Sequence, residues 1–118
     1  MNKYRDKSDF EINLRVAQII FNDSEYDVIK QSMEVVKFQN GNGKGVCHVF
    51  DPCNNPVDAM PIVKDNLISL EHDGIAWQVS CVRHPEISVW DGCKNYNDNF
   101  YRKAMELFLL MKDAENEK

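Results

Sequence analysis

The chain has 118 residues, of which 43% are hydrophobic and 28% charged, and its 14 basic and 19 acidic residues give a net charge of −5. This length predicts a single domain over residues 1–118, and the aromatic residues supply a core, which excludes disorder along the whole chain. The acidic balance excludes a highly basic nucleic-acid binder and a polybasic membrane anchor.

The sequence offers no segment for membrane insertion or export. The longest apolar run, Leu107–Met111, has five residues, against the roughly 20 that a spanning helix needs. The basic residues near the start are not followed by an apolar stretch, so no secretory signal is expected. We therefore expect a cytoplasmic protein whose four cysteines are free thiols.

The first predicted element is a helix over residues 10–21. Ser8 and Glu11 fit a capping box, in which each side chain bonds the backbone amide of the other residue. The preceding residues, 1–7, are expected to form a flexible polar leader. The apolar stripe of this helix is unusually wide, so the helix must be buried on two sides or covered by a partner.

Two β-hairpins are predicted in the middle of the chain. The first covers residues 33–50, around an Asn-Gly-rich turn at 40–43, and the second covers 67–82, around a turn at 71–74. Residues 25–32 are ambiguous. One face of the last strand is predicted to be apolar and buried: Ile75, Trp77, Val79 and Cys81.

A polar loop with several prolines separates the two hairpins, over residues 51–61. Asn55 is placed to cap a short helix that has Pro56 at its first position. Pro61 is expected to interrupt this helix after one or two turns.

The side chains of Asn54, Asn55 and Asp58 have two interpretations. They form either a recognition loop for a protein or small ligand, or a turn in which they bond their own backbone while Pro52 and Pro56 set its path. We favour the structural interpretation, because turns that define a fold have the same composition.

The last predicted element is a helix over residues 98–112, capped by Asn97 or Asp98 and preceded by a loop at 83–96. Residues 113–118 are expected to be a flexible tail. The order of elements indicates an α+β domain: an antiparallel sheet built from two β-hairpins, covered by an N-terminal and a C-terminal helix, with a short central helix.

Apolar residues left over on the two long helices predict a protein interface. Ile12, Val16 and Ile19 widen the stripe of the first helix, and Met105 and Leu109 lie off the stripe of the last. Surplus apolar surface of this kind is most often used in two-fold self-association. The expected partner is a second copy of the chain or another, unidentified protein.

Cys81, His84 and Cys93 are the candidates for a metal site. The first two form a C-x2-H pair, and thiolate and imidazole are ligands of zinc. However, no paired C-x2-C is present, and Cys81 falls on the apolar face of a predicted strand, where cysteine packs as a small hydrophobe. We therefore expect no metal and no cofactor.

An enzyme and a nucleic-acid binder are the remaining alternatives. No nucleophile elbow, phosphate-binding loop, zinc-protease or dinucleotide motif occurs. Basic residues near both ends could form a modest patch beside stacking aromatic side chains: Lys3, Arg5, Lys7, Arg15, Arg102 and Lys103, with Trp77, Trp90, Tyr96 and Tyr101. The net charge opposes this alternative.

Three segments of the chain carry a family resemblance: SDFEINLRVA at 8–17, DPCNNPVDAMPIV at 51–63 and KAMELFLLM at 103–111. Together they resemble the NinX-like family of small proteins of lambdoid bacteriophages and their prophages. The middle segment is the most specific, and it departs at Met60 and Val63, where Trp and Ile are expected. The resemblance implies an accessory protein in the cytoplasm of an infected enterobacterium, and it brings no catalytic residue with it.

Overall fold

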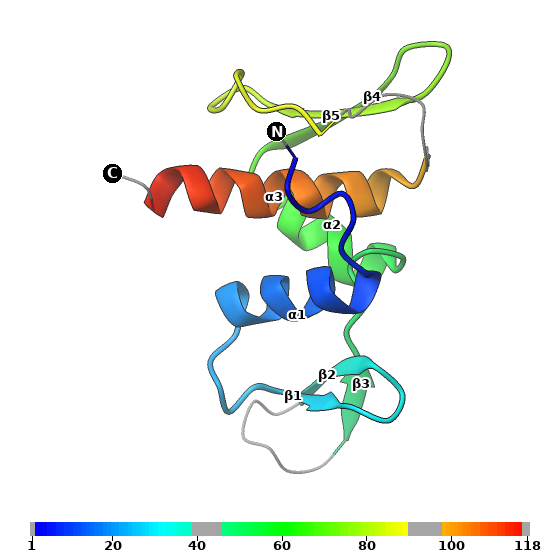
Figure 1. The fold of residues 1–118 in the computed structure, drawn as a ribbon, viewed down its shortest axis with the longest axis vertical. Coiled ribbons are helices and arrows are strands. Elements are labelled where there is room, and N and C mark those ends of the chain that lie inside the picture. Colours follow the sequence, from blue (N-terminus) through cyan, green and yellow to red (C-terminus); the bar gives the residue numbers. More distant parts are fainter. Residues whose placement is uncertain (1, 39–45, 90–97, 117–118) are drawn as a thin grey trace.

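Three helices separate two small antiparallel sheets in the computed structural model of the chain, which describes residues 2–38, 46–89 and 98–116 (Figure 1). The helices are α1 (Asp9–Ile20), α2 (Pro56–Asp65) and α3 (Phe100–Asn116). One sheet has the order β1-β2-β3, from β1 (Tyr26–Ile29), β2 (Glu34–Phe38) and β3 (Cys47–Val49). The other pairs β4 (Ile68–His72) with β5 (Trp77–Cys81). The predicted α+β class is confirmed.

The two hairpins do not join into the single sheet that we predicted. The β4-β5 sheet packs on one side of α3, α1 packs on the other side, and the three-stranded sheet lies beyond α1 (Figure 1). The physical reason is that both α1 and α3 are apolar on two faces, so each is sandwiched and the hairpins are kept apart. The ambiguous residues 25–32 supply β1, which pairs with β2.

The start of α1 follows the predicted capping box. The Ser8 hydroxyl oxygen accepts a hydrogen bond from the Glu11 amide at 3.1 Å, and the Glu11 carboxylate accepts one from the Ser8 amide at 3.3 Å. Ile12, Val16 and Ala17 are completely buried between α3 and β2. Of the two explanations for the wide stripe, burial on two sides within the chain is therefore the one that the structure shows.

The central helix begins at the predicted residue, Pro56, but it does not end at Pro61. The Asn55 side chain caps α2 by accepting from the Val57 amide at 3.0 Å. The helix then runs through Pro61 to Asp65, so the predicted interruption is wrong. Pro61 lies on the exposed side of α2, where water can replace the hydrogen bond that its missing N–H would give to Val57. Apolar burial on the opposite side holds the helix together.

Replacing Pro61 with alanine is expected to stabilise the protein by about 1–2 kcal/mol. The change restores an internal helical hydrogen bond, and the gain is reduced because proline also restricts the unfolded chain. Pro56→Ala is the matched control and should change stability by less than about 1 kcal/mol, because the first helical amide has no partner in the helix. Urea unfolding of the two variants measures the difference, and equal effects would contradict the prediction.

The second hairpin confirms most of the predicted alternation. Trp77, Val79 and Cys81 face α3, and the last two are buried. Ile75 is an exception: it lies in the turn before β5 and is 88% exposed. The Asp73 carboxylate organises this turn by accepting from the Ile75 and Ala76 amides, which lowers the pKa of Asp73.

The last helix is capped by a residue that we did not predict. The Asn99 side chain accepts from the amides of Tyr101 and Arg102 at 3.0 and 3.3 Å. Asp98 instead accepts from the Trp77 amide, and Asn97 lies outside the described residues. The helix continues to Asn116, so residues 113–116 are helical rather than a loose tail.

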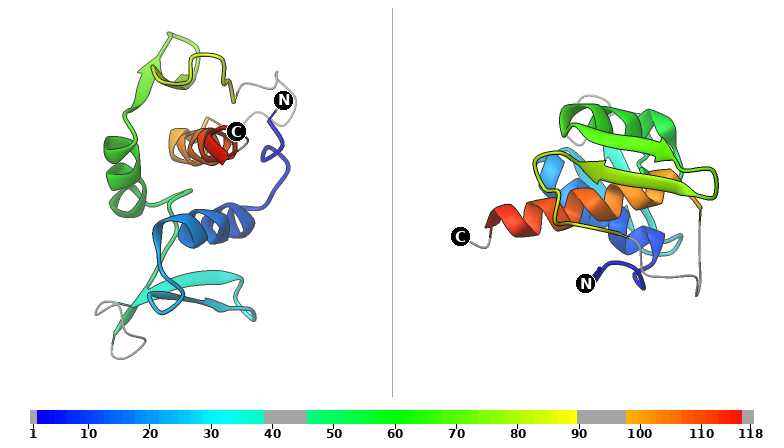
Figure 2. Two further views of the ribbon diagram at one scale, coloured as in Figure 1. Left: turned by 90° about the vertical axis from the view of Figure 1, so that its left-hand side faces the viewer. Right: turned by 90° about the horizontal axis from the view of Figure 1, so that it is seen from above.

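The leader is a fixed part of the fold. Residues 2–7, here called the N-terminal strap, cross one side of α3 to reach the start of α1 (Figure 2). Asn2 and Tyr4 are only 5% and 3% exposed. The Asn2 amide donates to the Glu106 carboxylate at 2.6 Å, and the Tyr4 hydroxyl donates to Asp113. The predicted flexible leader is therefore wrong for the described residues, because polar contacts with α3 hold the strap in place.

Candidate functional site

Arg102 lies at the centre of a polar network that joins α3 to the strap and to the start of α1. Its Nε donates to Glu106 and its Nη1 donates to Asp9, each at 2.6 Å. Its Nη2 donates to the backbone oxygens of Tyr4 and Lys7 at 2.9 and 2.6 Å. One guanidinium therefore joins α3 to two neighbouring segments, the strap and the start of α1, that lie more than 90 residues away in sequence, and its role in this network is structural.

The candidate recognition loop adjoins this network. The Asn54 amide donates to Asp9 at 3.0 Å, and its oxygen accepts from Asn99 at 3.1 Å. Asn55 caps α2, as described above. Asp58 is buried, accepts from the Asp51 amide at 2.9 Å and pairs with Lys37 at 3.6 Å.

All three candidate side chains thus make hydrogen bonds within the chain. This geometry supports the interpretation of residues 51–58 as a structural turn. Asn13 completes the turn from α1: it is buried, donates to Asp51 at 2.8 Å and accepts from the Cys53 amide at 3.1 Å. Sequence reasoning missed Asn13, because a single asparagine inside an apolar helix gives no signal of a distant loop partner.

Burial sets the protonation of one group in the strap and one in this turn. Burial, together with the hydrogen bond to Asp113, raises the pKa of Tyr4 to about 12. Burial also raises the pKa of the Cys53 thiol. A protonated, buried thiol is a poor nucleophile and a poor metal ligand, so Cys53 acts as a packing residue.

Most of the predicted interface residues are inside the monomer. Ile12, Val16 and Met105 are 0% exposed and Leu109 is 1% exposed, so the prediction that these four form an interface is wrong. They are buried because α3 is enclosed by α1, α2, β4 and β5 (Figure 2). Only Ile19, at 44% exposure, remains accessible.

The metal candidates are not brought together among the described residues. Cys81 is buried and its thiol faces the Asn66 backbone oxygen at 3.6 Å. His84 lies 3.3 Å from Glu115 and 3.7 Å from Glu86, and Cys93 lies outside the described residues. In residues 2–38, 46–89 and 98–116, no group of three or more His, Cys, Asp or Glu side chains is placed to hold a metal ion.

The two ends of the chain do meet, but they do not present their basic side chains as one patch. Arg102 is buried in the network, and Lys3 and Lys7 pair with Asp113 and Glu11 at 3.1 and 3.9 Å. Lys103 pairs with Asp98 at 3.2 Å. The half-buried Trp77 packs between His72 and Phe100, and Trp90 and Tyr96 lie outside the described residues.

An exposed apolar face on α2 is the feature that sequence reasoning missed. Val57 and Met60 are 73% and 41% exposed, and they share the outer side of the helix with Pro61 and Lys64. The opposite side of α2 packs on α3 and β4. The sequence did contain a signal of this face, since Val57 and Met60 are one helical turn apart. The predicted interruption of the helix at Pro61 concealed it.

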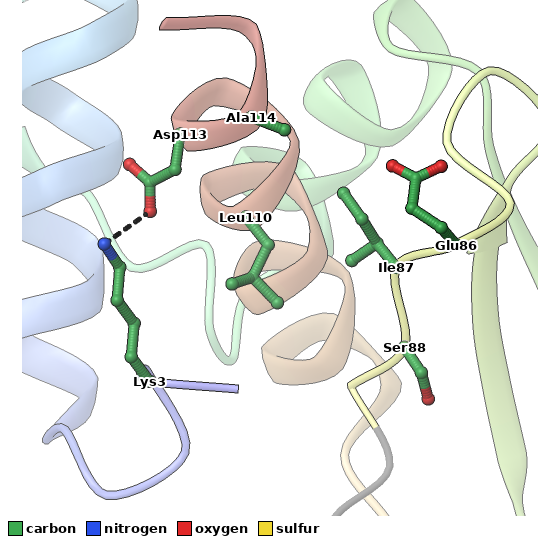
Figure 3. Close-up of a pocket in the computed structure, with 7 residues that line it drawn as sticks. All are labelled: Lys3, Glu86, Ile87, Ser88, Leu110, Asp113 and Ala114. Carbon is green, nitrogen blue, oxygen red and sulfur yellow. Dashed lines mark ion pairs between the residues drawn. The ribbon is translucent and has the colours of Figure 1, made fainter. Parts of the chain in front are cut away.

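A pocket of about 330 Å³ lies beside the strap (Figure 3). Three segments contribute its walls: the strap through Lys3, α3 through its last two turns, and the segment after β5 through residues 86–88. The Lys3 ammonium lies 3.1 Å from the Asp113 carboxylate across one side of the opening. The pocket is on a different part of the molecule from the α2 face.

Comparisons with protein-family models, with curated proteins and with solved structures find no match for this chain. In the part of the chain that the structure describes, no helix has the length and apolar character needed to cross a membrane. Among the described residues, the α2 face and the strap pocket are two candidate sites.

Proposed function

We propose that this chain is a non-enzymatic accessory protein that binds another protein through the exposed face of α2. The observation that carries the proposal is the exposure of Val57 and Met60 on a helix that is otherwise well packed. Apolar side chains spaced one turn apart on an open helix face are the contacts that helix-mediated protein recognition uses. The partner is a second copy of the chain or a host or phage protein.

The setting that we propose is the cytoplasm of a phage-infected bacterium. Its support is the resemblance to NinX-like proteins, which is most specific over residues 51–63, the segment that contains most of α2. Met60, one of the two departures from the expected family pattern, lies on the proposed contact face, whereas Val63 is buried.

A variant that introduces negative charge into the face tests this function. Val57→Glu/Met60→Glu is expected to fold normally, because substitutions at exposed positions change stability by about 0.5 kcal/mol. Ile75→Glu is the matched control, since Ile75 is also exposed and apolar but lies in the β4-β5 turn. Native mass spectrometry first shows whether the purified wild type is a monomer or a dimer.

We expect the double variant to weaken partner binding at least tenfold and the control variant to leave it unchanged. For a dimer, sedimentation velocity over a range of concentrations measures the effect; for another partner, quantitative cross-linking in infected cells does so. Binding that survives the double variant would contradict the proposal. A wild type that stays monomeric and shows no cross-link sensitive to Val57→Glu/Met60→Glu would also contradict it.

The runner-up is a weak nucleic-acid binder, supported only by the basic residues of the strap. Retention on single-stranded DNA that falls steeply with salt would favour it. A zinc protein or hydrolase is the third alternative, and zinc bound at one equivalent per chain in the same native mass spectrum would favour that class.

A further inference from the structure

We propose that the strap pocket binds a primary ammonium group attached to a small aliphatic body. The proposal is independent of the α2 face, because none of the pocket's lining residues belongs to α2. It rests on the volume of the pocket, on its apolar floor and on the charges at its opening.

The floor of the pocket is aliphatic. Ile87, Leu110 and Ala114 converge from the segment after β5 and from successive turns of α3 (Figure 3). All three are partly exposed, so apolar surface remains in contact with solvent. Covering this surface with an aliphatic group of four or five carbons releases water and so favours binding. A volume of about 330 Å³ accommodates a group of this size.

The polar lining selects a cation. Glu86 and Asp113 contribute two carboxylates and Lys3 contributes one ammonium, so the lining carries a net charge of −1. Lys3 lies against Asp113, which also accepts a hydrogen bond from Tyr4. The ionic neighbour of Glu86 is His84 at 3.7 Å, which carries charge only when it is protonated. A ligand ammonium at the opening therefore gains most from Glu86.

The strap makes the pocket adjustable. Side chains of the Lys3–Asp113 pair are 62% and 33% exposed, and ion pairs this accessible to water are weak. A ligand can therefore displace the Lys3 side chain without opening the fold, because the strap backbone is held separately by Arg102. The same ammonium chemistry occurs in a free aliphatic amine and in the first residue of a peptide.

The test is a titration of ¹⁵N-labelled protein followed by heteronuclear NMR. Isoamylamine is the probe, and isoamyl alcohol is its uncharged counterpart of similar shape. We expect saturable amide shifts in residues 86–88 and 110–114 with isoamylamine, with a Kd in the millimolar range, and at least threefold weaker binding of the alcohol. Comparing leucinamide with isoamylamine distinguishes a peptide N-terminus from a free amine as the preferred source, and N-acetyl-leucinamide is the uncharged counterpart of leucinamide.

Two variants test the site itself. Glu86→Gln is expected to weaken isoamylamine binding about two- to fivefold, within the range for an exposed ion pair, while Glu71→Gln on the outer face of β4 leaves it unchanged. Ala114→Leu fills the pocket and should abolish the shifts. Equal binding of amine and alcohol, equal effects of the two glutamate variants, or no saturable shift up to about 50 mM would overturn the proposal.

Discussion

Replacing Arg102 with methionine is expected to destabilise the fold by about 3–5 kcal/mol. The substitution keeps the aliphatic bulk of the side chain but leaves Glu106, which is 7% exposed, as a buried carboxylate without its cationic partner. It also removes the donors to the backbone oxygens of Tyr4 and Lys7. Burial acts to lower the pKa of Arg102, but the hydrogen bonds to Glu106 and Asp9, together with the nearby negative charge of Glu106, raise it above its ordinary value, so the guanidinium is charged at every accessible pH.

Urea unfolding gives the stability change, and hydrogen exchange gives its location. The amides of Tyr4 and Lys7, which bond within the strap, should lose protection before the rest of the fold. Lys112→Met is the matched control: its ammonium makes an exposed pair with Glu115 at 3.3 Å, worth less than about 1 kcal/mol.

A second variant separates the network from simple packing. Arg102→Met/Glu106→Met removes both buried charges together and should be more stable than Arg102→Met alone, because no unpaired carboxylate remains. If the double variant is instead the less stable one, the cost of Arg102→Met comes from lost packing and not from the uncompensated charge.

Truncating Leu109 to alanine is expected to cost about 2–5 kcal/mol, as expected for a leucine that leaves a cavity in a close-packed core. Leu109 is 1% exposed on α3, although its position off the main apolar stripe predicted a surface contact. Ile19→Ala is the control on α1, where the side chain is 44% exposed, and should cost less than about 1 kcal/mol.

The dependence of the Leu109→Ala effect on protein concentration distinguishes burial in the monomer from burial in an interface. A core role predicts that the unfolding midpoint of Leu109→Ala falls equally at low and high protein concentration. An interface role predicts a cost that vanishes on dilution, since dissociation has then already exposed the side chain. Thermal unfolding at two concentrations a hundredfold apart distinguishes these outcomes.

Local features of the fold were predictable where the responsible residues are neighbours in sequence. The Ser8–Glu11 capping box and the Asn55 cap both formed as expected. The pairing of β4 with β5 also followed from alternation and turn residues. In each case one short segment contains both the donor and the acceptor, or both strands and their turn, so its chemistry does not depend on the rest of the chain.

The candidate site was predicted less well, because its features depend on residues that are distant from one another in sequence. Apolar spacing identifies which residues avoid water, but it does not say what covers them, so Ile12 and Leu109 were assigned to a partner that turned out to be the chain itself. Pro61 predicted an interruption of α2 that the structure does not have. Burial of the opposite face of the helix offsets the cost of the proline, and this burial is a tertiary effect.

The sequence by itself determined the class of the fold and the N-terminal caps of α1 and α2. Only the tertiary structure decided that two sheets form rather than one, that the leader becomes a strap, and that Val57 and Met60 are left exposed. The reason is that these outcomes depend on contacts between distant segments, such as Arg102 with Tyr4 and Asn13 with Asp51. Hydrophobic patterning and local hydrogen bonding act over a few residues, whereas the choice of what covers each apolar face is made by the whole chain at once.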